Sequence, residues 1–163
     1  MTALPLRLPL HREAVRQEWI DYNGHLSEAY YVLVFGHATD ALMAGCGLDA
    51  DYRASTGCSL YTVESHLRYL REVPDGAQLA VRTRVLAATA KKAHFTHEMY
   101  VLPAPDAMPL PDAAPAATTE LLTLHVDQAT SRTAPFPERS LARLHTLTEP
   151  PPPWTGRAIS LAG

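Results

Sequence analysis

The sequence predicts an α+β fold in which one long helix packs against an antiparallel β-sheet of five or six strands. Residues 27–46 repeat apolar side chains at intervals of three and four, which is the period of a helix. Three later segments, 60–70, 79–88 and 94–102, alternate apolar and polar residues as strands do, and turns separate them. One helix followed by a run of strands favours a helix layer on an antiparallel sheet.

The residues around the long helix predict how it begins and ends. Residues 13–20 alternate weakly and predict a short first strand. Asp21–Gly24 then supplies turn residues, and Ser27 is a suitable N-cap. Gly45–Gly47 supplies the stop, so we expect strand, turn and helix in close succession.

The strand predicted over residues 60–70 divides its side chains between two faces. Strict alternation places Tyr61 and Tyr69 on one face, and Glu64 and His66 on the other. Residues 118–126 predict the last long strand. The two tyrosines are therefore expected to lie together, away from the acid.

Proline-rich segments mark the parts of the chain where no regular structure is expected. Residues 103–115 are rich in proline and predict a loop. A short helix is expected after Pro135–Glu138, and the four prolines from Pro150 predict an extended tail, poorly ordered unless a partner holds it. We expect one domain over residues 1–147, followed by a tail over residues 148–163.

Length, charge and cysteine content narrow the class of protein. The 163 residues are enough for one domain with a real core. The formal charge of −3 and the lack of a basic run disfavour nucleic-acid binding, and no segment is apolar enough for a membrane helix. The first six residues lack signal-peptide features, and Cys46 and Cys58 have no CxxC spacing. A cytoplasmic, reduced protein is expected, with a single disulfide left open.

The most informative segment, residues 19–31, puts an acid, a polar turn and a helix start close together. The Asp21 carboxylate would lie beside helix N–H groups that have no partner inside the helix. An acyl carbonyl between them would meet a base or nucleophile on one side and an electrophile on the other. This arrangement outlines an acyl-transfer site, although aspartate before Asn-Gly is also common in simple turns.

The order of these elements and the Asp21–His25 segment resemble the hot-dog fold, and more narrowly the acyl-CoA thioesterases related to 4-hydroxybenzoyl-CoA thioesterase. In that family Asp-x-x-Gly-[His/Ile], followed by a tyrosine, joins the first strand to the central helix. Tyr30–Tyr31 supplies the aromatic position here. The segment Tyr69–Arg71 with Gly76 is also family-like, and the resemblance covers residues 13–145.

A narrower resemblance rests on two longer runs, residues 18–25 and 61–71. Both are similar to the betainyl-CoA thioesterases of carnitine breakdown, which occur alone or fused behind a carnitine dehydrogenase. The hot-dog fold by itself does not determine the substrate. This narrower likeness implies one, betainyl-CoA.

The resemblance implies roles for the residues around the turn. Asp21 would attack the thioester carbonyl or activate water, while the backbone N–H groups of Gly24 and His25 would polarise the carbonyl oxygen. The His25 side chain either takes part or is a polar group at the helix start. Asn23 would orient water or hold the turn. Glu64 is either a second carboxylate at a subunit interface or a solvated acid on an outer sheet face.

Aromatic and basic residues are candidates for binding the substrate. Five rings either fill the core or form a cage for a trimethylammonium group, with each contact contributing about 0.5–2 kcal/mol. Two lysines in a predicted turn either meet coenzyme A phosphates or are solvated. No metal is expected, because the H-x-x-H pair on a strand points to opposite faces. The rings are Trp19, Tyr22, Tyr30, Tyr61 and Tyr69, with Tyr31 beside the same site and favoured as a core ring; the lysines are Lys91 and Lys92, and the pair is His94 and His97.

The sequence therefore predicts a thioesterase that hydrolyses a small acyl-CoA, with betainyl-CoA as the leading substrate and no cofactor beyond the coenzyme A of the substrate. Two alternatives stay open: a hot-dog enoyl-CoA hydratase using Asp21 and His25, and a non-catalytic acyl-CoA-binding module. A small sheet with one helix leaves an exposed edge, so a homodimer or homotetramer is expected. No G-x-S-x-G motif supports a serine hydrolase.

Overall fold

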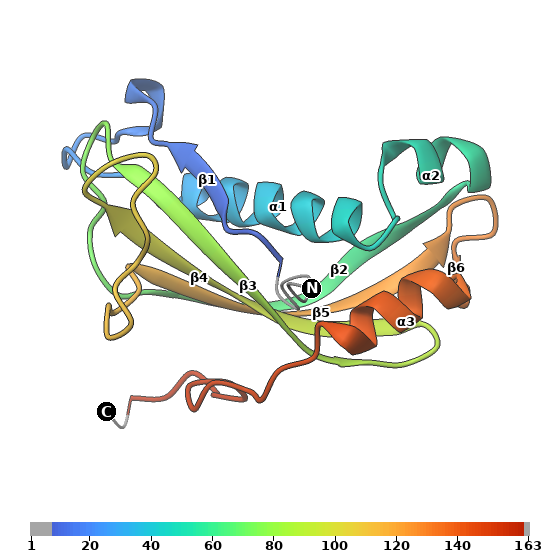
Figure 1. The fold of residues 1–163 in the computed structure, drawn as a ribbon. Coiled ribbons are helices and arrows are strands. Elements are labelled where there is room, and N and C mark those ends of the chain that lie inside the picture. The colour runs from blue at the N-terminus through green and yellow to red at the C-terminus, as the bar shows by residue number, and fades with distance from the viewer. Residues whose placement is uncertain (1–7, 162–163) are drawn as a thin grey trace, which may run out of the picture.

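The computed structural model describes residues 8–161 and consists of a curved, six-stranded antiparallel sheet around one long helix (Figure 1). Helix α1 (Glu28–Gly45) lies on the concave side of the sheet, and α2 (Ala50–Thr56) and α3 (Glu138–Thr146) lie near one end of it. The α+β prediction is confirmed. The strands are β1 (His11–Ala14), β2 (Cys58–Tyr69), β3 (Gln78–Ala88), β4 (Lys92–Leu102), β5 (Ala117–Asp127) and β6 (Arg132–Thr133).

The strand order β1-β3-β4-β5-β2 makes β1 and β2 the two edges of the sheet, with β6 beside one end of β5. A tight turn connects β3 to β4, and the loop predicted over residues 103–115 connects β4 to β5. We call the side of the sheet toward α1 the inner face and the other side the outer face. Apolar side chains of the inner face and α1 form the core.

The length and hydropathy of the helices bear on the membrane prediction. Between residues 8 and 161, no single helix is long and apolar enough to cross a membrane. Helices α1 and α2 are together long and apolar enough to cross a membrane, but the chain bends by 67° between them. The prediction about the first six residues lies outside the described part of the chain.

The first strand is shorter than predicted. Strand β1 ends at Ala14, and Gln17–Trp19 forms a 3-10 turn instead of continuing the strand. The reason is the burial of Trp19, whose ring is 4% exposed and stacks on Tyr30 of α1 at 5.5 Å between centroids. The chain therefore leaves the sheet so that this large ring can pack against the helix.

Helix α1 is confirmed within a residue of its predicted ends, with Ser27 as N-cap and Cys46 as C-cap. Its sheet-facing side is buried, whereas Val32 and Leu33 are 56% and 40% exposed. The helix is thus not wrapped on every side. Helix α2 was not predicted, because none of its residues is buried and it therefore has no apolar repeat to recognise.

A β-bulge in β2 overturns the predicted sharing of faces. The register shifts between Thr62 and Glu64, so that Tyr61 lies opposite Leu124 and Glu64 lies opposite Leu122. Residues 122 and 124 alternate on one face of β5, which places Tyr61 and Glu64 together on the outer face. Tyr69 lies on the inner face. The extra residue of a bulge cannot be seen from simple alternation.

The two histidines of the H-x-x-H segment point to opposite faces, as predicted: His94 lies on the outer face and His97 on the inner face. His97 is buried between the hydroxyls of Thr39 and Thr83, each 2.9 Å from a ring nitrogen. Burial, with a smaller effect of His11, lowers the pKa of His97 to about 3. His97 is therefore a neutral core residue.

The tail after α3 is held by the sheet rather than poorly ordered. Thr148 bridges to Val85, and the Arg82 guanidinium donates to Glu149 at 2.9 Å. The backbone N–H of Gly156 donates to Glu120 Oε2 at 2.7 Å. These contacts place the tail along the outer face, whereas the predicted domain boundary at residue 147 stays a prediction.

Both cysteines are free thiols, so the disulfide left open by the sequence does not form. Burial raises the pKa of the Cys46 thiol to about 11, although Arg143 acts in the opposite direction. Cys46 is therefore a core thiol and is not activated as a nucleophile.

Candidate active site

The turn before α1 is built around the backbone and side chain of Asp21. Its N–H donates to the His25 carbonyl at 3.0 Å, and its own carbonyl accepts from the Gly24 N–H at 3.0 Å. Asp21 Oδ1 also accepts from the Asn23 N–H at 2.8 Å. Gly24 has a φ of 81°, which favours glycine at this position. The second oxygen, Oδ2, has no partner among the described residues and is free for chemistry.

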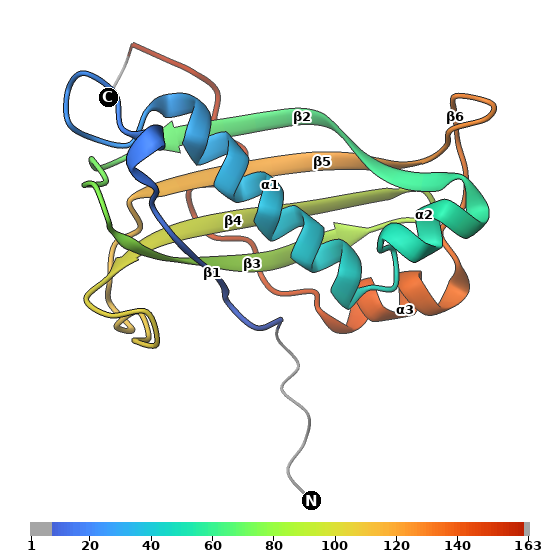
Figure 2. The same ribbon diagram turned by 90° about the horizontal axis from the view of Figure 1, so that it is seen from above.

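The turn is fastened directly to the start of α1. The Ser27 N–H donates to the Trp19 carbonyl at 3.0 Å, and the Leu26 N–H donates to the Val73 carbonyl at 2.8 Å. Glu28 and Ala29 begin the helix, so their N–H groups have no acceptor within it. Asp21 and a set of open helix donors therefore lie close together. Figure 2 shows the start of α1 at one end of the molecule.

A groove of about 600 Å³ opens at this point. The turn, the first residues of α1, the end of β2 and the chain after it form its walls. We call it the helix-start groove, and its lining residues are Asp21, Asn23, His25, Leu26, Glu28, Tyr31, Tyr69, Leu70, Arg71 and Glu72.

Two tyrosines form the aromatic wall of the groove. Tyr31 and Tyr69 meet edge to face, with centroids 5.0 Å apart and an interplanar angle of 88°. The Tyr31 hydroxyl donates to the Arg71 carbonyl at 3.3 Å, and the Tyr69 hydroxyl donates to the Glu28 carbonyl at 3.4 Å. Burial raises the pKa of both phenols, so both stay neutral at physiological pH.

The charges lining the groove are mostly negative. Three carboxylates, those of Asp21, Glu28 and Glu72, face it. His25 Nε2 lies 3.2 Å from Glu72 Oε2, and the Arg71 guanidinium donates to the Ala114 carbonyl. Because three carboxylates outnumber the one guanidinium, the groove favours a cationic or neutral guest over an anionic one.

Several predicted residues lie outside the groove. Trp19 and Tyr30 stack in the core, with the Arg16 guanidinium 5.1 Å from the Trp19 centroid. Tyr22 is 98% exposed. Trp19 and Tyr30 therefore follow the core alternative considered for these rings. Tyr69 lines the groove, and its role in binding stays a prediction.

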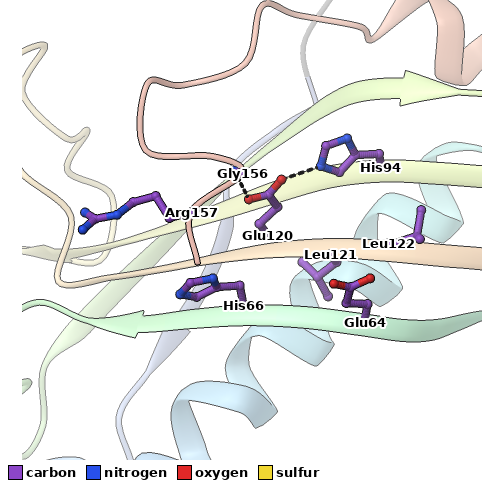
Figure 3. Close-up of a pocket in the computed structure, with 8 residues that line it drawn as sticks. All are labelled: Glu64, His66, His94, Glu120, Leu121, Leu122, Gly156 and Arg157. Atoms are coloured by element: carbon purple, nitrogen blue, oxygen red, sulfur yellow. Dashed lines mark hydrogen bonds and ion pairs between the residues drawn. The ribbon is translucent and has the colours of Figure 1, made fainter. Parts of the chain in front are cut away.

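Glu64 and Tyr61 lie on the outer face. Glu64 lines a smaller hollow of about 380 Å³ (Figure 3), which we call the outer-face hollow. The Tyr61 hydroxyl accepts from Gln128 Nε2 at 3.0 Å. The outer-face hollow is lined by Glu64, His66, His94, Glu120, Leu121, Leu122, Gly156 and Arg157.

Lys91 and Lys92 are exposed in the hairpin between β3 and β4. This hairpin lies at the end of the sheet opposite the start of α1 (Figure 1), where the Asp21 turn is attached. Within one chain the lysines therefore do not join the helix-start groove.

Sequence reasoning missed part of the groove wall. Glu28, Arg71 and Glu72 line it but were not assigned to the site, and Tyr31 was considered beside the site but favoured as a core ring. The Tyr69–Arg71 segment was noted only as family-like. Its position at the end of a strand facing the helix start was the available signal, but no local pattern reveals that approach.

The match to known families decides the identity. Residues 15–144 match the model of the Thioesterase-like superfamily. The chain belongs to this superfamily. It is a thioester hydrolase, and the recognised resemblance to hot-dog acyl-CoA thioesterases is confirmed.

Individual relatives agree with this assignment. The chain is 43% identical over 160 residues to the betainyl-CoA thioesterase of Pseudomonas aeruginosa, covering 94% of this chain and 95% of the relative. It is 44% identical to the L-carnitine dehydrogenase/betainyl-CoA thioesterase of Agrobacterium fabrum, covering 91% of this chain but 29% of that protein.

Solved structures share the fold over nearly the whole chain. A putative thioesterase from Pseudomonas putida KT2440 has a TM-score of 0.76 and 35% identity, covering 96% of this chain and 98% of that one. A Staphylococcus aureus protein solved in complex with CoA has a TM-score of 0.80 and 24% identity, covering 99% of both chains.

Proposed function

We propose that this thioesterase hydrolyses betainyl-CoA to betaine and free coenzyme A. The observation that carries the proposal is the composition of the helix-start groove, where Tyr31 and Tyr69 lie beside three carboxylates. A trimethylammonium group cannot donate N–H hydrogen bonds, so aromatic faces and negative charge are the features that recognise it. The names of the two relatives at 43% and 44% identity support the same substrate.

The chemistry follows from the position of Asp21. Its free carboxylate oxygen either attacks the thioester carbonyl or removes a proton from the attacking water. The carbonyl oxygen becomes negative as the tetrahedral intermediate forms, and open N–H groups at the start of α1 stabilise it. Collapse breaks the C–S bond, and the departing thiolate takes up a proton, from protonated Asp21 in the general-base route or from water in the nucleophilic route, so that coenzyme A leaves as the thiol. In the nucleophilic route a water molecule then hydrolyses the acyl–Asp21 anhydride to release betaine. No separate cofactor enters these steps.

The N–H of Gly24 already donates to the Asp21 carbonyl, so it is not available to donate to the oxyanion. The N–H of His25, the other predicted donor, has no acceptor among the described residues, so it stays in the proposal together with the N–H groups of Glu28 and Ala29 at the start of the helix. The role of Gly24 in the proposal is therefore to hold the turn through its positive φ.

We include a homodimer in the proposal, formed through the β2 edge. Strand β2 is twelve residues long and pairs only with β5. Val63 on this edge is 52% exposed, and Leu33 of α1 is 40% exposed. A long unpaired edge with exposed apolar side chains on it is normally covered by another chain. A Val63→Lys variant is expected to shift the protein toward monomer in light scattering, and an unchanged mass would contradict pairing through β2.

Pairing through β2 also accounts for the lysines. An antiparallel copy of β2 would bring the Cys58 end of one strand toward the Tyr69 end of the other. The hairpin with Lys91 and Lys92 lies at the Cys58 end, since Lys92 pairs opposite Leu124. The partner's lysines would thereby approach this chain's groove and meet the coenzyme A phosphates. We also keep the cytoplasmic location that the sequence predicts as part of the proposal.

The test compares two substrates that differ in one atom. Betainyl-CoA and 3,3-dimethylbutyryl-CoA have the same shape, but the second has carbon in place of the quaternary nitrogen. We expect kcat/KM for thiol release to be higher for betainyl-CoA by about 2- to 30-fold for one aromatic contact. Equal kcat/KM values for the two substrates would agree with thioesterase activity but would contradict recognition of a cationic acyl group.

Two other results would replace the proposal. Addition of water to an enoyl-CoA without thiol release would identify a hydratase that uses Asp21 and His25. Tight binding of acyl-CoA with no turnover of any substrate would identify a binding module. Each of these results comes from a different measurement than the comparison of betainyl-CoA with 3,3-dimethylbutyryl-CoA, so the outcomes can be told apart.

A further inference from the structure

A second group of reactive side chains lies away from the helix-start groove, between β1 and α1. His11, Glu13 and His37 each offer one ligand atom, and these atoms lie within 4.8 Å of one another. His11 Nε2 is 3.1 Å from Glu13 Oε2, and His37 Nδ1 is 2.8 Å from the same oxygen. Two imidazole nitrogens thus converge on one carboxylate.

The local structure explains why these three residues meet. His11 and Glu13 are two residues apart on β1, so both side chains lie on one face of the strand. Arg12 lies on the other face, where its guanidinium donates to the Pro105 carbonyl at 2.8 Å. His37 comes from the middle of α1, which contacts β1. The ligands therefore come from two rigid elements.

We propose that His11, Glu13 and His37 bind one divalent transition-metal ion, for which Zn²⁺ is the best match. Two imidazoles and one carboxylate are common zinc ligands, with bonds of about 2.0–2.2 Å. At such bond lengths, neighbouring ligands of a tetrahedral ion are about 3.3 Å apart. The two separations between nitrogen and the Glu13 oxygen, 3.1 and 2.8 Å, need to open by only a few tenths of an ångström, and the two histidine nitrogens lie within 4.8 Å of each other.

The degree of exposure suits a bound ion with one water ligand. The side chains of His11, Glu13 and His37 are 22%, 13% and 35% exposed, respectively. An ion can reach them from solvent, and a water molecule can complete the coordination. Without an ion, the two histidines hold the carboxylate by hydrogen bonds, so the group is preorganised in either state.

Other contacts between histidine and carboxylate lack a third ligand. His94 lies 2.8 Å from Glu120 Oε1, but the other oxygen of Glu120 accepts from the Gly156 N–H. An N–H donor cannot bind a cation. Among the described residues, only the group of His11, Glu13 and His37 brings three ligand atoms together.

The position of the site predicts what the ion does. Strand β1 is a four-residue edge strand, and it lies at the opposite edge of the sheet from β2. An ion at this site would fasten β1 to α1 and stabilise the native state over the unfolded chain. It would not touch the groove or the proposed dimer edge, so hydrolysis does not depend on it.

The test uses untagged, metal-free protein titrated with Co²⁺ and then Zn²⁺. We expect one Co²⁺ per chain, visible by its d–d absorption and displaced by Zn²⁺, and a rise in Tm of several degrees with Zn²⁺. His37→Gln should weaken binding by at least about tenfold. The matched control is His94→Gln, which removes a histidine from a two-ligand contact and should bind as the wild type does.

Two results would overturn the proposal. The first is no Co²⁺ or Zn²⁺ binding by a folded wild-type protein, which would leave a metal-free hydrogen-bond group. The second is equal binding by wild type and His37→Gln, which would place the ion elsewhere. A second variant, His11→Gln, guards against misfolding of the first, and the circular dichroism of each variant verifies its fold.

Discussion

The helix-start groove and the outer-face hollow both contain histidines and carboxylates, but Asp21 of the groove and Glu120 of the hollow are in different states. In the hollow, Glu120 accepts from both His94 and the Gly156 N–H, so both of its oxygens are engaged (Figure 3). In the groove, Asp21 uses one oxygen to hold its turn and keeps the other. A carboxylate with a free oxygen can act on a substrate.

The electrophile also differs between the two regions. The groove contains the N-terminus of an 18-residue helix, whose first N–H groups lack helical partners. The outer-face hollow lies on mid-strand residues such as Leu122, whose backbone groups serve the sheet. Similar residue types thus have different uses, because only the groove offers an unengaged acid beside open donors.

The largest expected effect separates two aspartates in the same kind of turn. Asp21→Asn keeps an oxygen for the Asn23 N–H but removes the charge, so we expect kcat for thiol release to fall about 10²- to 10⁴-fold. The matched control is Asp127→Asn, because Asp127 Oδ1 accepts from the Ala129 N–H at 2.9 Å in the same way. Assays of both variants would contradict the assigned role if Asp21→Asn hydrolysed as fast as the control.

An intermediate effect is expected at the aromatic wall. Tyr69→Leu removes a ring from the groove and should lower kcat/KM for betainyl-CoA about 2- to 30-fold, with a smaller change for 3,3-dimethylbutyryl-CoA. Tyr69→Phe keeps the ring and loses only the hydrogen bond to the Glu28 carbonyl. Equal losses for the charged and neutral substrates would show that Tyr69 packs against the acyl group without recognising its charge.

The smallest effect is expected in the outer-face hollow. Glu64→Gln should change kcat/KM by less than about threefold, because Glu64 lies on the sheet face away from Asp21. Steady-state thiol release measures this change. A loss as large as that of Asp21→Asn would instead show that Glu64 reaches the reacting atoms, as the sequence originally indicated, from a second chain.

Much of the groove could be predicted from sequence because its parts are local. The turn from Asp21 to Gly24 and the helix from Glu28 to Gly45 depend on turn residues, caps and a periodic apolar pattern. Tyr69 was also predicted, through its likeness to the family. These features need only a few neighbouring residues to form.

The remaining parts depended on contacts between distant segments. The burial of Trp19 shortens the first strand, and the bulge at Thr62 and Glu64 separates Tyr61 from Tyr69. Neither feature can be recognised from alternation, because each depends on a contact with another element: Trp19 packs on α1, and the bulge is defined by pairing with β5.

The local pattern of this chain is sufficient to establish one long helix, the acid-bearing turn before it and the strands that follow, since each has its own period or turn chemistry. Only packing decides which side chains share a site. It brings Glu72 to the groove, moves Glu64 to the outer face, and joins His37 to β1, because these pairings depend on how the sheet curves around α1.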